Sequence, residues 1–229
     1  MLDNNEPLSV VCWLWGDKYP VEHVNKLYRG FAKNYDLPFN FFCFTDQPDN
    51  PEFIPEVQTL QIPTEHAKTK RCARRLKIFS LEMRDIIGSR ILQLDVDMVI
   101  VGNITELLST HEEFKIWKSP SNGEHSFAYN PSLMLMNVGC RKHIWRLFNK
   151  DPKTALKEAQ LNKWTGSDQA VIGNLLRKNE AVWDEKDGIY SFRDEISVEN
   201  LPENAKIVGF YDDFDMNKLD IPWLKEHWA

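Results

Sequence analysis

Short apolar runs alternate along the first half of the chain with segments whose apolar residues recur at helical spacing. Apolar runs of about four to eight residues indicate buried strands, and apolar residues three or four positions apart indicate helices. This pattern predicts strands over residues 9–15, 39–44 and 91–94, a short strand over 57–62, and helices over 21–35 and 69–87. In the second helix, Leu76, Phe79, Met83 and Ile86 would share one face, and Gly88 would end it.

The second half of the chain continues the alternation of strands and helices. Strands are expected over residues 114–118, 132–137 and 205–211, and helices over 144–148, 152–160 and 168–177. Strands that alternate with helices favour a mostly parallel, doubly wound sheet with helices on both faces. A length of 229 residues suits one domain of ordinary size. We therefore expect a single α/β domain.

Composition and charge narrow the classes of protein. Hydrophobic residues make up 42% and charged residues 27%, as in soluble globular proteins. The formal net charge of −6 argues against nucleic acid as a partner. No stretch approaches the ~20 apolar residues of a membrane span, and residues 1–7 are acidic where a secretory signal would be basic. These features predict a cytoplasmic protein.

Four scattered cysteines form no dense framework and no C-x-x-C pair. They are Cys12, Cys43, Cys72 and Cys140, and three of them stand in apolar surroundings. Buried free thiols in a reducing compartment are therefore expected, in place of disulfides or a metal site.

Two carboxylates follow the apolar run of residues 91–94. On a strand, Asp95 and Asp97 would point to the same side, roughly 6–7 Å apart. Two bare carboxylates side by side are costly unless a cation accompanies them. Mg²⁺ and Mn²⁺ are commonly held by one or two carboxylates together with substrate phosphates. The pair predicts a metal site at the carboxyl end of a strand, and the alternative is a solvated loop that begins at Asp95.

A basic run covers residues 68–77, with six positive charges on ten residues. Cations near the beginning of a helix oppose its dipole, and a bound phosphate group would reverse that effect. Arg75 is the best candidate for such a contact because Leu76 lies next to it on the inward side. The alternative is a solvated basic face, which also leaves peripheral contact with acidic lipids or a partner open.

Further candidates lie at the ends of other predicted elements. Trp13, Trp15 and Tyr19 surround the end of the first strand, where aromatic rings can stack on a nucleobase and Gly16 permits close approach. For Trp13, packing in the core is the preferred interpretation. Asp168 begins a predicted helix, so a simple N-terminal cap is its alternative role.

Four motifs, in the same order along the chain, resemble those of glycosyltransferase family 8 and its relatives. Residues 94–104, which contain Asp95-Val96-Asp97, are similar to the D-x-D segment of that family, and Arg75-Leu76-Lys77 is similar to the R-L-K stretch before it. Residues 130–137 resemble the segment that follows, and residues 166–170 resemble the D-Q motif. The resemblance extends from about residue 9 to residue 211.

The resemblance implies a GT-A fold and transfer of a sugar from a nucleotide sugar, with a UDP-sugar as donor and retention of anomeric configuration. It implies Mn²⁺ or Mg²⁺ held by Asp95 and Asp97, and sugar contacts from Asp168 and Gln169, the latter near the anomeric carbon. The residues expected to bind the donor are Leu14, Trp15, Gly16, Tyr19, Arg75, Lys77, Val96 and Asn130. Residues 8–110 would form the nucleotide-binding half, and 111–229 the half that faces a glycan, lipid or protein acceptor.

One position departs from the family pattern. The family closes its metal site with a histidine near the C-terminus, and residues 207–213 contain none. Tyr211 or Asp212 would have to take that place. Loss of the histidine also leaves open a catalytically inactive module that binds a sugar nucleotide or a glycan.

A phosphatase of the haloacid dehalogenase type is the rival enzyme class. It also places D-x-D after an apolar strand, and its first Asp is a nucleophile. Tyr211-Asp212-Asp213 could imitate its distal acidic motif. However, its D-x-D normally ends the first strand, whereas about ninety residues precede Asp95 here.

Overall fold

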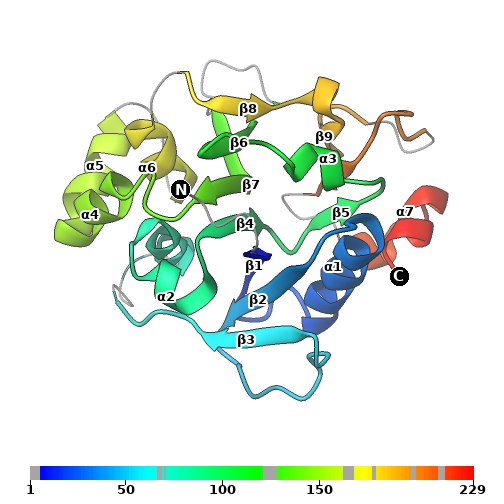
Figure 1. The fold of residues 1–229 in the computed structure, drawn as a ribbon, viewed down its shortest axis with the longest axis horizontal. Coiled ribbons are helices and arrows are strands. Elements are labelled where there is room, and N and C mark those ends of the chain that lie inside the picture. Colours follow the sequence, from blue (N-terminus) through cyan, green and yellow to red (C-terminus); the bar gives the residue numbers. More distant parts are fainter. Residues whose placement is uncertain are drawn as a thin grey trace.

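A seven-stranded sheet forms the centre of the protein (Figure 1). The computed structural model describes residues 6–65, 69, 71–120, 128–161, 168–176, 179–196, 200–210 and 215–229. The strands of the sheet are β1 (Leu8–Leu14), β2 (Phe39–Thr45), β3 (Val57–Gln61), β4 (Arg90–Leu94), β6 (Phe114–Lys118), β7 (Tyr129–Asn137) and β8 (Ala181–Trp183), in the order β3-β2-β1-β4-β7-β6-β8. A smaller sheet has the order β5-β10-β9, with β5 at Met98–Ile100, β9 at Ile189–Ser191 and β10 at Ile207–Gly209.

The large sheet is mostly parallel, as predicted. Strands β3, β2, β1 and β4 all run in parallel, and β8 is parallel to β6. Only β7 is antiparallel to both of its neighbours, β4 and β6. The carboxyl ends of β1, β2, β4, β6 and β8 therefore meet the beginning of β7 at one edge. Ligands bind at this kind of edge in open α/β sheets.

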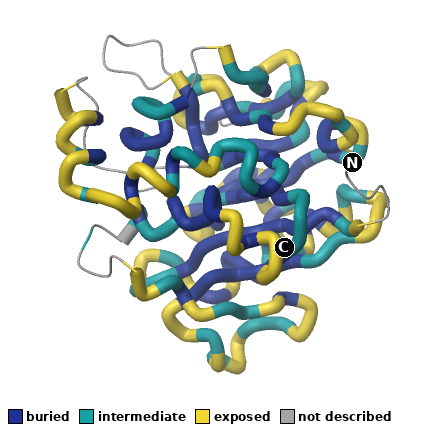
Figure 2. The backbone as a smooth tube through the Cα atoms, turned by 60° about the vertical axis from the view of Figure 1, so that its left-hand side comes forward, coloured by how far each residue is buried: buried dark blue, intermediate teal, exposed yellow. Residues whose placement is uncertain are grey.

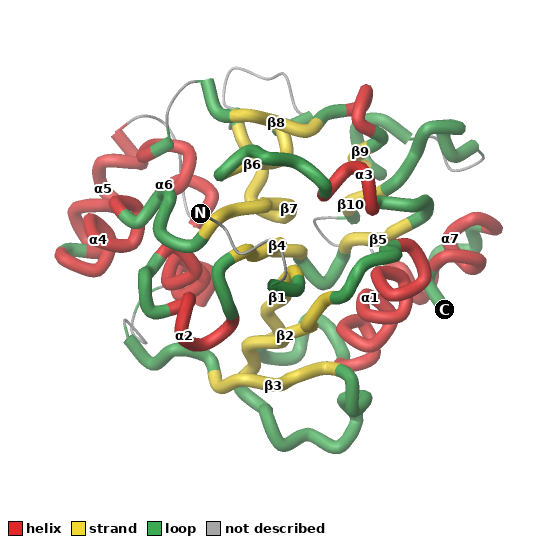
Figure 3. Tube along the Cα trace, in the orientation of Figure 1, coloured by secondary structure: helices red, strands yellow, loops and turns green. Residues whose placement is uncertain are grey.

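Helices cover both faces of the sheet and create two apolar cores (Figure 3). The helices are α1 (Val21–Asn34), α2 (Met83–Ile87), α3 (Thr105–Leu108), α4 (His143–Lys150), α5 (Pro152–Leu161), α6 (Asp168–Leu175) and α7 (Pro222–His227), with 3-10 helices η1 (Arg71–Phe79), η2 (Glu185–Asp187) and η3 (Met216–Lys218). Helix α1 lies on one face, and η1 with α4 to α6 on the other. Figure 2 shows that buried residues are concentrated in the interior and exposed residues at the periphery.

Strand β1 contributes alternate side chains to the two cores. Val10, Cys12 and Leu14 belong to the core on the side of α1, whereas Val11 and Trp13 belong to the core on the side of η1. All seven residues of this strand are buried. The core to which each residue of β1 belongs is therefore set by the two-residue period of the strand.

The prediction of a single helix over residues 69–87 is wrong. The segment forms η1 and, after a turn, the separate helix α2. Leu76, Phe79 and Met83 are buried as expected, but Ile86 is 45% exposed. The break changes the direction of the chain, so a periodicity that continues across it no longer describes one face. Strand β10 is also shorter than the predicted strand 205–211.

Two expectations concern the chain as a whole. All four cysteines are free, with Cys12 and Cys43 buried side by side on β1 and β2. None of the helices in the described ranges has the length and hydrophobicity that crossing a membrane requires.

Candidate active site at the edge of the sheet

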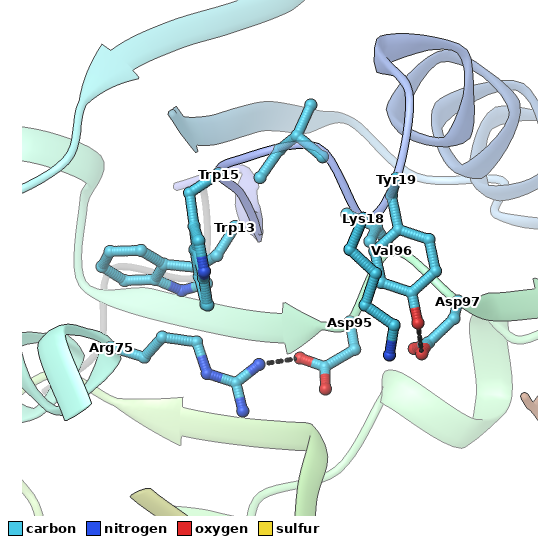
Figure 4. A pocket seen from close by; sticks show the side chains of 9 residues that line it. Trp13, Trp15, Lys18, Tyr19, Arg75, Asp95, Val96 and Asp97 are labelled. Carbon is cyan, nitrogen blue, oxygen red and sulfur yellow. Dashed lines mark hydrogen bonds and ion pairs between the residues drawn. The ribbon is translucent and has the colours of Figure 1, made fainter. Parts of the chain in front are cut away.

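A cavity of about 210 Å³ opens beyond the carboxyl ends of β1 and β4 (Figure 4). It is lined by Trp13, Leu14, Trp15, Lys18, Tyr19, Arg75, Asp95, Val96 and Asp97. Seven of these nine residues were expected from the sequence to hold a metal ion or a nucleotide sugar. The cavity thus brings together residues from three separate segments of the chain.

Asp95 and Asp97 lie in the turn between β4 and β5, where the amide of Met98 donates to the carbonyl of Asp95 at 3.2 Å. The prediction that these two residues lie on a strand, whose alternation would point them to the same side, is therefore wrong. Both carboxylates nevertheless border the cavity, because the turn folds over the end of β4. The alternative of a solvated loop is also wrong, since Asp97 is only 9% exposed.

The two oxygens of the Asp95 carboxylate are both engaged. Its Oδ1 accepts a hydrogen bond from Arg75 Nη1, and its Oδ2 accepts one from Ser132 Oγ at 2.8 Å. The backbone amide of Asp95 donates to the carbonyl of Ser132 at 3.0 Å. Asp95 is thus tied to η1 and to β7, and its charge is compensated by the guanidinium.

Arg75 joins Asp95 to a second carboxylate on α6. Its Nε and Nη2 both reach Asp168 Oδ2, at 2.8 and 2.7 Å. The side chain of Asp168 is 2% exposed, and burial raises its pKa although Arg75 acts to lower it. Burial acts to lower the pKa of Arg75, but Asp168 and Asp95 outweigh it, so the guanidinium stays charged. Asp168 is therefore more than an N-terminal cap of α6.

Asp97 has no comparable cation. Its Oδ2 accepts a hydrogen bond from the hydroxyl of Tyr19 at 2.7 Å, and within the described ranges it forms no ion pair. Burial first, and then the negative charge of Asp95, raise the pKa of Asp97 to about 7, although Tyr19 and Lys18 act to lower it. At neutral pH this carboxylate is poised between its protonated and ionised forms.

The chain returns to this turn just before the two candidate ligands near the C-terminus. The amide of Phe210 donates to the carbonyl of Asp97 at 2.9 Å. Tyr211 and Asp212 lie outside the described residues. Among the residues that the structure describes, no three His, Cys, Asp or Glu side chains are grouped closely enough to hold a metal ion together.

Two tryptophans form the wall of the cavity on the side of Arg75 (Figure 4). Trp13 is 4% exposed, stacks on Phe44 with ring centroids 4.4 Å apart, and donates to Gln93 Oε1 at 3.3 Å. These contacts confirm its place in the core. Trp15 is only half-buried and also lines the cavity.

A second cavity of about 300 Å³ adjoins the first over the ends of β1 and β2. Leu14 and Tyr19 line both cavities. The second cavity is mostly polar elsewhere, with Asp17, Thr45, Asp46, Gln47, Asn50 and Glu52 among its lining residues. Gly16 also lines it, with a φ of 62° that favours glycine, and its amide donates to Asp46 Oδ2 at 3.1 Å.

Asn130 and Gln169 are two of the predicted residues that are absent from the lining of the first cavity. Asn130 is buried, and its side-chain oxygen accepts from the amide of Ser132 at 3.0 Å. Gln169 Nε2 donates to the carbonyl of Tyr129 at 2.9 Å, which ties α6 to the beginning of β7. Both residues thus brace the segments that carry Ser132 and Asp168.

Lys77 does not take the position expected of a donor-binding residue. It is absent from the cavity lining and forms ion pairs with Glu65 and with Glu82, the second at 3.0 Å. Its side chain thus joins η1 to the segments on either side. The R-L-K stretch contributes one residue to the cavity, Arg75, because neighbouring residues of a helix point in different directions.

Sequence reasoning missed two residues of the site. Lys18 lines the cavity, and Ser132 donates to Asp95. A cation in the short loop after the first strand was a usable signal for Lys18. No local signal identifies Ser132, because its partner is 37 residues away along the chain.

No family model matches this sequence, and no curated protein matches it either. Solved structures do match. A galactosyltransferase, LgtC, in complex with donor and acceptor sugar analogs, is 11% identical, with a TM-score of 0.63 and coverage of 96% of both chains. An active-site mutant of LgtC gives 12% identity and a TM-score of 0.62, with 93% of this chain and 91% of that chain covered.

A further match is the glycosyltransferase GlyE of Streptococcus pneumoniae TIGR4, at 12% identity and a TM-score of 0.60. It covers 94% of this chain but 57% of GlyE. The chain has the glycosyltransferase fold. The expected GT-A-type α/β architecture is thereby confirmed, over nearly the whole length of the chain.

Proposed function

We propose that this chain is a glycosyltransferase that moves a sugar from a nucleoside-diphosphate sugar to an acceptor hydroxyl with the help of a divalent cation. A UDP-sugar and retention of configuration are the donor and outcome that the family resemblance favours. The single observation that carries the proposal is the arrangement of Asp95 and Asp97 at the sheet edge, where Arg75 compensates Asp95 while Asp97 forms no ion pair among the described residues. The fold shared with LgtC and GlyE supports it.

The donor set fits Mn²⁺ or Mg²⁺. Asp97 is a desolvated carboxylate whose pKa is raised to about 7 by burial and by Asp95. Hard carboxylate oxygens suit these ions, which commonly complete their coordination with water and substrate phosphates. Such a cation would supply Lewis-acid compensation for the charge of the departing nucleoside diphosphate. The amide of Phe210 donates a hydrogen bond to the backbone of Asp97. Tyr211 and Asp212 follow Phe210 in the sequence and remain candidate additional ligands.

The protein groups around the cation have distinct tasks in this proposal. Tyr19 orients the carboxylate of Asp97 through its hydroxyl. Arg75 adds fixed positive charge beside the diphosphate, where negative charge develops during transfer. Asp168 holds Arg75 in place. The family resemblance assigns contacts with sugar hydroxyls to Asp168 and places Gln169 near the anomeric carbon. Positioning of this kind can contribute much of the rate enhancement.

The two adjoining cavities suit the two ends of the donor. The polar cavity over β1 and β2 would take the nucleobase and ribose, with Gly16 allowing close approach of the backbone. The diphosphate would lie at Asp95 and Asp97, and the sugar near Arg75 and Asp168. The acceptor would be a glycan, a lipid or a protein.

The rival phosphatase has less support. Its D-x-D normally ends the first strand, whereas about ninety residues precede Asp95 here, and the fold is shared with LgtC and GlyE. An inactive module that binds a sugar nucleotide would share the fold and the cavities, and only catalysis separates it from a transferase.

A thermal-shift screen tests the donor assignment. UDP, GDP and ADP and their glucose conjugates would be added with Mn²⁺ or Mg²⁺ to the intact chain. A ligand at ~100 times its Kd adds about 2.7 kcal/mol of stability. Stabilisation that needs both metal and nucleotide supports the proposal, and the absence of any such pair contradicts it.

Replacement of Asp97 by Asn tests catalysis. Donor hydrolysis or transfer should fall by more than about 100-fold because a metal ligand is lost, while the isosteric amide still accepts from Tyr19. Asp85→Asn, on the exposed surface of α2, is the matched control and should retain full turnover. Unchanged turnover in Asp97→Asn would remove the role of the metal, and phosphate release from an aryl phosphate would favour the phosphatase. Binding without turnover in the wild-type chain would favour the inactive module.

A further inference from the structure

The first cavity has two chemically different walls because it lies across the end of the sheet. Trp15 packs against the core that contains Trp13 and Leu76, on the side of η1. Tyr19 packs against the other core, which contains Leu14 and Val96, on the side of α1. Figure 4 shows the same division, with the two indoles beside Arg75 and Tyr19 beside Asp97.

The polar groups on each side indicate which end of a donor each wall faces. On the tryptophan side, Arg75 leads to the buried carboxylate of Asp168. On the tyrosine side, Tyr19 and Leu14 continue into the polar cavity over β1 and β2. The carboxylates of Asp95 and Asp97 lie between the two walls. A donor with its diphosphate at these carboxylates would extend its nucleobase past Tyr19 and its sugar toward Trp15.

We infer that Trp15 is a platform for the transferred sugar, and that the ring it covers is a pyranose. This rests on the proposed function and replaces the expectation that Trp15 stacks on the nucleobase. A pyranose ring presents C–H groups on its faces and hydroxyls at its rim. An indole can cover the C–H face, while Arg75, held in place by Asp168, meets the rim.

Trp15 is better suited to this contact than Trp13. Trp13 is 4% exposed and held by Phe44 and Gln93, so little of its surface remains for a ligand. Trp15 is half-buried, and it lines the cavity. Trp13 contributes little accessible surface to the wall, and Trp15 supplies the accessible ring. Trp15 is therefore a specificity-determining residue for the sugar.

Binding measurements on paired ligands test this inference. Calorimetric titrations with Mn²⁺ would compare UDP with UDP-glucose and UDP-galactose for the wild-type chain, Trp15→Ala and Trp15→Leu. Trp15→Leu keeps apolar volume in case the alanine variant folds poorly. If the donor screen selects another nucleotide, its diphosphate and hexose conjugates replace the uridine pair.

The expected result is a change in the ratio of the two affinities. In both Trp15 variants the Kd for UDP should stay within about twofold, while the Kd for the UDP-hexose rises about tenfold. Tyr19→Ala, the control on the opposite wall, should weaken UDP and UDP-hexose by the same factor. Trp15→Phe, which keeps an aromatic ring, should retain most of the affinity for the UDP-hexose.

Two outcomes would overturn the inference. Equal weakening of UDP and UDP-hexose in the Trp15 variants would show that the indole contacts the nucleotide. Unchanged affinity for both ligands would show that Trp15 contacts neither part. If the wild-type chain binds no nucleoside diphosphate in the presence of metal, the proposed function itself is contradicted. This result differs from the two outcomes above, in which the wild type binds and only the role of Trp15 fails.

Discussion

Two carboxylate sites share one cavity and differ in how their charge is compensated. Asp95 and Asp168 are joined by Arg75, so two negative charges surround one guanidinium. Asp97, two residues beyond Asp95, has the hydroxyl of Tyr19 and a pKa raised to about 7 by burial and by Asp95. In the first arrangement, Arg75 compensates the negative charges of Asp95 and Asp168. In the second, a bound metal ion would compensate the charge of Asp97.

This difference separates residues that hold the site together from a residue that is prepared for a ligand. A buried charge that is paired contributes to a single defined geometry, and removal of its partner is costly. A buried charge that is unpaired is costly until a counterion arrives. The two sites should therefore respond in opposite directions to substitution and pH.

The largest expected effect follows from removing the shared cation. Arg75→Gln leaves Asp95 and Asp168 without a counter-charge, and loss of one partner of a buried pair typically costs about 3–5 kcal/mol. Urea unfolding at pH 8 should show this loss in the metal-free chain. The loss should shrink toward acid pH because protonation of Asp168, whose pKa burial raises, removes the repulsion. Arg29→Gln, in an exposed ion pair with Glu22, should cost at most about 1 kcal/mol. Equal effects of the two substitutions would contradict the comparison.

The opposite sign is expected at Asp97. Its pKa is about 7 in the folded chain against 3.8 for an ordinary aspartate, so its contribution to stability is present below pH 4 and is lost as pH rises through 7. Three pKa units correspond to at most about 4 kcal/mol. Asp97→Asn carries no such charge, so the metal-free variant should be more stable than the wild type at pH 8.

Melting curves of both chains without metal check this sign. The difference in Tm should be near zero at pH 4 and grow toward pH 8, at about 2–4 °C per kcal/mol for a chain of this size. Addition of Mn²⁺ should stabilise the wild type at pH 8 and leave Asp97→Asn unaffected. A variant that melts below the wild type at pH 8 would show that the ionised carboxylate already stabilises the metal-free chain.

The smallest effect is expected from the hydroxyl of Tyr19. Tyr19→Phe removes the hydrogen bond that acts to lower the pKa of Asp97. A hydrogen bond to a charged group contributes about 1.5–3 kcal/mol, part of which water can replace at this cavity. Mn²⁺ affinity at pH 7 should fall by about tenfold or less. Tyr28→Phe is the control, because Tyr28 lies on α1 and does not line the cavity, and it should bind Mn²⁺ like the wild type. Tighter Mn²⁺ binding by Tyr19→Phe would contradict the proposed orientation of Asp97.

Much of the fold was predictable because long elements carry periodic signals. The bounds predicted for α1, β2 and β6 lie within one residue of the observed ones. Strands β5 and β9 were missed because three residues are too few to show a period. The break between η1 and α2 was also missed. There the apolar spacing continues across the turn, and η1 packs against α4 and α6.

The candidate site shows the same division. Asp95, Asp97 and Arg75 were predicted from local motifs, and all three border the cavity. The placement of Lys77 outside the cavity was not predictable, because it depends on ion pairs with Glu65 and Glu82, which lie in other segments. Tyr211 and Asp212 remain predictions.

By itself, the amino-acid sequence determined which chemical groups follow which strands, since hydrophobic period and local motif are properties of neighbouring residues. It thereby determined the mostly parallel sheet and the carboxylates at its edge. The tertiary structure alone decided which charges neutralise one another and which wall of the cavity each aromatic ring joins. These choices depend on burial and on partners from distant segments, such as Arg75 with Asp168 across 93 residues. Desolvation makes such pairings decisive, and it exists only once the chain has folded.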